Sequence, residues 1–158
     1  MPYKILQVLT ITLAGFMVGN ELSVAAFLHP SLRRLPDDMH ARVRRDFAVL
    51  FGRFMPFWYT GVALLSIAAA WMGPPFRSTA GRLLLAAAIL WLVTIVYTVI
   101  LPKPLNSRIA AWLLESLPVD WQAQSKRWDR FHAIRMVMLV AAFVCLVMGV
   151  VGSVCSGN

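Results

Sequence analysis

Four long apolar segments, separated by stretches rich in basic residues, glycine and proline, constrain the fold of this 158-residue chain. They cover about residues 5–28, 54–72, 83–101 and 133–152. A helix needs about 20 mostly apolar residues to cross a bilayer, and each segment has about that length. We therefore expect one all-α domain over residues 1–158, an integral membrane four-helix bundle in a lipid bilayer.

The composition supports a membrane protein and excludes a disordered chain. Hydrophobic residues make up 59% of the chain and charged residues 14%, whereas soluble domains are nearer half apolar and a quarter charged. The net charge of +8 resides in the connections between the apolar segments. This distribution disfavours nucleic acid as a partner and favours connections that face an anionic membrane surface. The two cysteines, Cys145 and Cys155, predict neither a disulfide framework nor a zinc site.

Basic residues orient the predicted bundle. Residues 29–53 carry six Lys or Arg and residues 102–132 carry five, against three in the remaining parts outside the spans. The positive-inside rule then puts both long connections in the cytoplasm. Both termini are expected outside, in the periplasm if the membrane is a bacterial plasma (inner) membrane. The first segment is longer than the apolar region of a signal peptide and contains Glu21, so we expect it to remain as a span.

Both long connections are predicted to be helical. Pro36, Asp37 and Asp38 are typical of a helix start, and that helix should continue into the second span with a bend at Pro56. After Pro104, apolar residues at helical spacing predict an amphipathic helix along the membrane surface. These residues are Ile109, Trp112, Leu113 and Leu117.

The helix that enters the fourth span carries a polar and aromatic stripe. Trp121, Trp128, His132 and Arg135 are spaced by 7, 4 and 3 residues. At about 100° per residue they fall within an arc of about 60°. Arg135 lies just inside the apolar run, where a charge usually faces the bundle and has a partner. Glu21 in the first span is the candidate partner, either as a purely structural ion pair or as part of a site.

A metal site is a further candidate. His29 ends the first span and is expected at the same depth as His132. Two histidines and a carboxylate are metal-ligand types, although no HxxxH or HxxE spacing supports the assignment. The third histidine, His40, lies among Asp and Arg residues and is expected to be solvated.

The stretch from Pro104 to Arg135 resembles the DUF1772 family, which includes anthrone oxygenase-like membrane proteins. The resemblance rests on a P-x-N motif, a Trp, a D-W pair and an R-W-x-x-x-H-x-x-R motif entering the last of four spans. In this chain these are Pro104 to Asn106, Trp112, Asp120-Trp121 and Arg127 to Arg135. The resemblance implies a four-helix membrane protein. For a few members it also implies oxygenation of anthrones to anthraquinones without an obvious organic cofactor, while most members have no assigned reaction.

The residues can be assigned roles in such a reaction. An anthrone becomes reactive to oxygen once its methylene group is deprotonated. His132 could be the base, and Arg135 and Asn106 could stabilise the oxyanion. Trp128, Trp112 and Glu21 are assigned to substrate binding, with the indoles stacking on the rings. We expect these side chains to converge on a cytoplasm-facing pocket for a hydrophobic small molecule, between the first, third and fourth spans, with His29 at its rim.

Two other classes of function stay open. One is a binding module in which His29 and His132 hold a metal or a haem. The other is a non-catalytic structural or assembly protein in which Asn106, His132 and Arg135 tie helix ends together. The sequence fixes neither the cofactor nor the reaction, and it leaves a homo-oligomer open.

Overall fold

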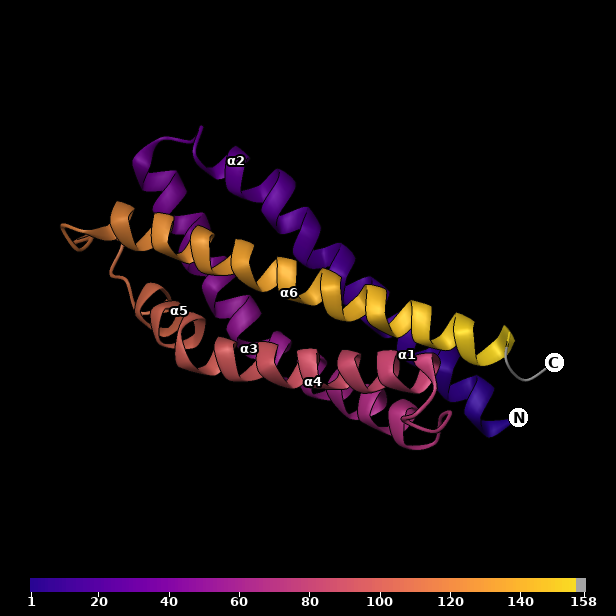
Figure 1. The fold of residues 1–158 in the computed structure, drawn as a ribbon. Helices are drawn as coiled ribbons and strands as arrows, with labels where there is room; N and C mark the ends of the chain where they lie inside the picture. Colours follow the sequence, from indigo (N-terminus) through magenta and orange to yellow (C-terminus); the bar gives the residue numbers. More distant parts are fainter. Residues whose placement is uncertain (156–158) are drawn as a thin grey trace.

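The computed structural model describes residues 1–155 and is all-α, with no strand in that range (Figure 1). Its long helices are α1 (Pro2–Ser23), α3 (Asp37–Trp71), α4 (Thr79–Ile100) and α6 (Trp121–Cys155). Helix α6 packs most extensively against α4, and α1 packs against both α3 and α6. Helix α1 begins and α6 ends at the same end of the bundle (Figure 1). We call the opposite end, where α2 and α5 lie, the basic end.

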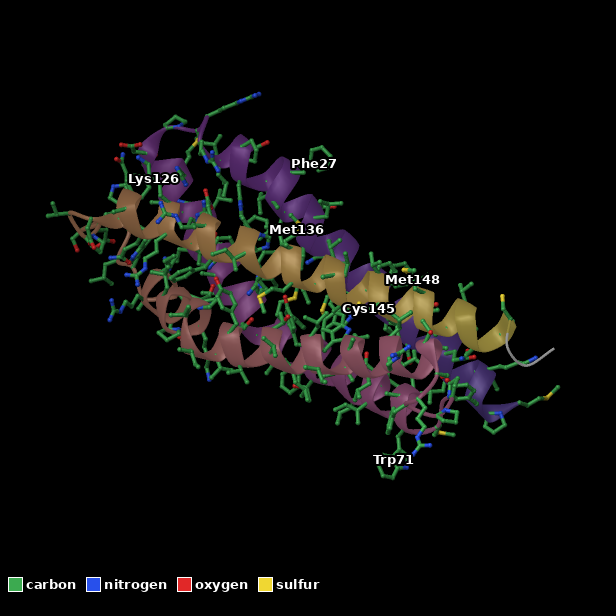
Figure 2. All side chains as sticks on the ribbon, viewed as in Figure 1. Phe27, Trp71, Lys126, Met136, Cys145 and Met148 are labelled. Carbon is green, nitrogen blue, oxygen red and sulfur yellow. The ribbon has the colours of Figure 1, made fainter. Side chains whose placement is uncertain are left out.

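Four helical stretches are long and apolar enough to cross a membrane, which makes the chain an integral membrane protein. They are Pro2–Leu32, Asp37–Trp71, Thr79–Ile100 and Trp121–Cys155. The outer surface is apolar: Phe27 is 71% exposed and Trp71 82% exposed, and both point away from the bundle (Figure 2). In a bilayer these side chains contact lipid, so their exposure is not a defect of packing.

The first helical stretch passes through Pro30 and does not stop before it. The π-helical turn η1 (Val24–Leu28) follows α1, and α2 (His29–Leu32) completes the stretch. The sequence pattern instead predicts that the first span ends at His29. A proline lacks the backbone N–H and crowds the carbonyl four residues earlier. Membrane helices absorb that conflict by local π adjustments, and η1 is one.

Helix α3 confirms that the first basic connection and the second span form one helix. It begins after Pro36, with Asp37 and Asp38 in its first turn, and runs through Pro56 to Trp71. Because Pro56 has no N–H, the carbonyl of Gly52 loses its usual helical donor.

The predicted amphipathic helix after Pro104 is wrong over most of its length. Helix α5 (Pro102–Ala110) contains Ile109 but ends before Trp112, Leu113 and Leu117. Trp112 is nevertheless buried, because its indole donates a hydrogen bond to Gln124 and packs edge-on against Trp121. These tertiary contacts, rather than helical periodicity, fix the segment between α5 and α6.

Candidate functional site

A carboxylate buried in the first span organises the polar interior of the bundle. Glu21 on α1 is 2% exposed and bonds three side chains. Arg135 donates from Nη2 and Nε to Oε2, at 2.9 Å and 3.2 Å. His132 Nε2 lies 2.8 Å from the same oxygen, and the Tyr59 hydroxyl donates to Oε1 at 3.0 Å. We call these four residues the Glu21 cluster, and the expected partnership of Glu21 with Arg135 is present.

The Glu21 cluster joins three spans. Glu21 comes from α1, Tyr59 from α3, and His132 and Arg135 from adjacent turns of α6. Tyr59 was not among the residues predicted for the site. A tyrosine inside an apolar span carries a hydroxyl that must find a partner there, and this requirement was the available signal.

A second carboxylate lies one turn nearer the basic end. Asp129 accepts a hydrogen bond from Arg44 at 2.7 Å and from Arg33 at 3.2 Å, and it lies 3.5 Å from Nδ1 of His29. The side chain of Arg44 is 2% exposed and that of Asp129 is 12% exposed, so this pair is largely shielded from solvent. We call these four residues the Asp129 cluster. Sequence reasoning missed Arg44 and Asp129, although Asp129 precedes His132 by three residues and therefore shares its helix face.

Aromatic rings join the two clusters into one polar layer. The His29 and His132 rings lie 4.8 Å apart between centroids. Trp128 stacks on His132 at 5.3 Å and meets His29 edge-on at 5.2 Å. The guanidinium of Arg44 lies 4.9 Å above the Trp128 ring. The layer therefore runs without a break from Asp129, near the basic end, to Glu21.

Each of these histidines has one nitrogen without a hydrogen-bond partner. Nε2 of His29 and Nδ1 of His132 are both buried and unpaired, while the other nitrogen of each ring faces a carboxylate. Metal-binding histidines commonly have a carboxylate on the second nitrogen. Within residues 1–155, however, no group of three or more His, Cys, Asp or Glu side chains could hold a metal ion. A haem plane does not fit between two rings that are in contact.

A partly open cavity of about 250 Å³ lies between α3, α4, α5 and α6. Its lining includes four residues discussed above or below: Tyr59, Asn106, Trp128 and Arg135. The other lining residues are Phe51, Gly52, Met55, Pro56, Thr60, Ile95, Thr98, Val99, Pro102, Lys103 and Ser107. The cavity thus combines apolar and aromatic sides with a few polar groups, which is typical of small-molecule sites.

The cavity differs in two ways from the expected pocket. It lies between the second, third and fourth spans, and α1 does not contribute to it. Its lining does not include four of the predicted site residues, namely His132, His29, Glu21 and Trp112. His29 is therefore not at the rim of the cavity. The imidazole of His132 faces Glu21 on α1, whereas Arg135 reaches both Glu21 and the cavity.

Asn106 fixes one side of the cavity. Its Nδ2 donates to the backbone carbonyl of Ala48 at 2.8 Å, and its Oδ1 accepts from the Trp128 indole at 3.2 Å. A Cβ atom on Gly52 would lie 2.9 Å from that same Nδ2, so a larger residue there would displace the Asn106 amide. Asn106 therefore ties Trp128 to α3, and one amide hydrogen and one lone pair of Oδ1 remain for a ligand.

The family model of the anthrone oxygenases matches residues 47–145. This segment is more than half of the chain, so the chain belongs to the anthrone oxygenase family, the one formerly called DUF1772. The match includes Asn106, Trp128, His132 and Arg135, while Glu21 lies before it. Comparison with curated proteins and with solved structures found no match.

Proposed function

We propose that this member of the anthrone oxygenase family oxygenates a flat, hydrophobic aromatic substrate of the anthrone class in the cavity between α3, α4, α5 and α6. The observation that carries the proposal is that Arg135 contacts both Glu21 and the cavity. Its guanidinium is held by Glu21 and at the same time lines a cavity that is largely apolar and aromatic. Such a group in a membrane interior usually marks a functional site.

Arg135 is suited to stabilise an oxyanion. Its Nε and Nη2 are bonded to Glu21, while Nη1 makes no hydrogen bond within residues 1–155. When an anthrone loses a methylene proton, negative charge develops on its carbonyl oxygen, and Nη1 can donate to that oxygen. In a cavity of low dielectric, a preorganised cation stabilises such a charge strongly. The electron-rich anion then reacts with O₂, and the net conversion is anthrone plus O₂ to anthraquinone plus water.

Trp128 and Tyr59 provide aromatic surface for the rings of the substrate. Trp128 is held by Asn106, so Asn106 acts mainly as a positioning residue for that surface. Glu21 contributes through Arg135 rather than by touching the substrate. Trp112 lies outside the cavity lining, and its role in this proposal is to pack the end of α5 against the start of α6.

In this proposal the substrate proton is taken up through Tyr59, and His132 acts as a positioning residue for Glu21. Tyr59 lines the cavity and donates to Glu21, which also contacts His132. A proton received by the Tyr59 oxygen can be matched by release of the Tyr59 proton to Oε1 of Glu21, while Oε2 stays bonded to His132 and Arg135.

The proposed orientation places the basic end in the cytoplasm and both termini outside, in a plasma membrane. It rests on the eleven basic residues in the two long connections against three near the other end. The cavity includes the first residues of α5, so in this orientation it opens near the cytoplasmic surface.

The test is oxygen-dependent turnover of an anthrone by protein in lipid nanodiscs, followed by anthraquinone absorbance and oxygen uptake. Empty nanodiscs give the spontaneous rate. We expect the protein to exceed that rate, and Arg135→Met to lose at least about tenfold of the excess. His40→Ala is the matched control, since His40 lies outside the cavity lining. Turnover no faster than in empty nanodiscs contradicts the proposal and leaves a structural role for the Glu21 cluster.

A second candidate, a metal-binding module, is favoured by the two unpaired nitrogens of His29 and His132. Metal analysis of the purified protein tests it. Stoichiometric metal that is lost in His29→Ala and in His132→Ala, but kept in His40→Ala, supports a two-histidine site. Equal metal content in all four proteins contradicts it.

A further inference from the structure

The charges around the cavity are unbalanced. Two of its lining residues, Lys103 and Arg135, are cationic, and none is Asp or Glu. The charge of Arg135 is compensated by Glu21. Lys103 makes no ion pair and no hydrogen bond within residues 1–155. One uncompensated positive charge therefore borders the cavity.

Other features of α5 add to this positive region. Lys103 is the second residue of α5, a nine-residue helix whose positive dipole end lies at Pro102 and Lys103, both in the cavity lining. Ser107, one turn further along, brings a hydroxyl donor to the same side. The α5 side of the cavity thus offers donors and positive charge.

Apolar side chains from α3, α4 and α6 make up much of the remaining lining. Met55, Ile95 and Val99 border the cavity from α3 and α4, and Trp128 borders it from α6. A volume of about 250 Å³ lies slightly below the usual range for drug-sized ligands, so it suits a compact flat ring system. Lys103 is exposed, and a group bound to it keeps contact with water while the rings enter the apolar part.

We infer that the natural substrate is an anionic aromatic compound, an anthrone-type ring system with a carboxylate or similar acidic substituent that binds Lys103 on α5. The inference rests on the proposed function and narrows it to acidic substrates. Arg135 on α6 receives the ring oxygen and Lys103 receives the acid group, so the substrate is held at two points. Charge-assisted hydrogen bonds are the stronger ones, and this pairing selects acids over neutral analogues of the same shape.

The experiment compares two redox-stable probes, anthraquinone-2-carboxylate and anthraquinone-2-carboxamide. Binding is measured by calorimetry with the full chain in nanodiscs of uncharged phosphatidylcholine, and empty nanodiscs correct for partitioning. We expect the acid to bind on the order of tenfold tighter than the amide. Lys103→Met should remove this difference and leave the affinity for the amide unchanged.

Lys126→Met is the matched control. Lys126 is an exposed lysine on α6 at the basic end, outside the cavity lining (Figure 2). It should keep the preference for the acid.

Two results would overturn the inference and leave the cavity as a site for neutral aromatics. One is equal affinity for the acid and the amide in the wild type, and the other is a preference for the acid that survives Lys103→Met. Loss of the preference when phosphatidylglycerol is added means that Lys103 binds lipid headgroups, which also overturns it. Failure of both probes to bind contradicts the cavity as the substrate site, and thereby the proposed function as well.

Discussion

Removal of Glu21 should destabilise the protein through the groups it leaves behind. In Glu21→Ala the Arg135 guanidinium loses its only ion-pair partner within residues 1–155, and the Tyr59 hydroxyl and the His132 imidazole each lose an acceptor. Breaking a buried ion pair from one side costs about 3–5 kcal/mol, and each buried polar group left unsatisfied costs about 1–3 kcal/mol. Arg135 is 9% exposed and borders a partly open cavity, so water can partly replace the carboxylate. We therefore expect a total loss of about 3–5 kcal/mol.

A double-mutant cycle separates the ion pair from the other contacts. Arg135→Met removes the unpaired charge, so the double variant should be more stable than Glu21→Ala by about 2 kcal/mol or more. The assay is reversible unfolding in mixed micelles, followed by circular dichroism. Glu115→Ala, at an exposed acid between α5 and α6, should stay within about 0.5 kcal/mol of the wild type.

Two results would refute this reasoning. One is a Glu21→Ala variant within about 1 kcal/mol of the wild type, which would mean that the carboxylate is not a buried counter-charge. The other is a double variant no more stable than Glu21→Ala, which would mean that the lost stability does not come from an unpaired Arg135.

Three further predictions follow from the geometry. Gly52→Ala should lower the free energy of unfolding by about 1–2 kcal/mol and also lower turnover, because its Cβ atom would press on Asn106. The control is Gly61→Ala on the same helix, whose Cβ would have nothing within 4 Å. In the same unfolding assay it should be neutral or slightly stabilising. Arg135→Lys should lose at least about tenfold in turnover, because an ammonium group cannot both pair with Glu21 and present a planar donor to the cavity. Wild-type turnover in this variant would count against the role of Arg135 in stabilising the oxyanion. A C-terminal reporter that is active only in the cytoplasm should be silent, and an active one would reverse the proposed orientation.

The sequence alone was sufficient for the architecture. Four apolar runs of about membrane length leave the backbone no other way to satisfy its hydrogen bonds than four helices. The pairing of Glu21 with Arg135 was equally predictable, because each is an isolated charge inside an apolar run and a lone charge there is costly. The start of α3 followed from local chemistry, since Pro36 and the acids after it favour a helix N-terminus.

Partners from distant segments could not be derived in this way. The contacts of Asp129 with Arg44, and of Tyr59 with Glu21, join residues whose polar groups could have found other partners. The end of α5 at Ala110 was also beyond sequence reasoning. Trp112 has helical spacing, but its burial depends on Gln124 and Trp121, which follow a turn that periodicity does not describe.

The position of the cavity was decided by helix rotation. Trp128, His132 and Arg135 were correctly expected on one face of α6, and all three are buried. That face spans about 60°, which is wide enough for His132 to point at Glu21 on α1 while Trp128 borders a cavity against α3, α4 and α5. Periodicity fixes which residues share a face. How that face is turned toward its neighbours depends on the packing of all four spans, and only the tertiary structure contains that information.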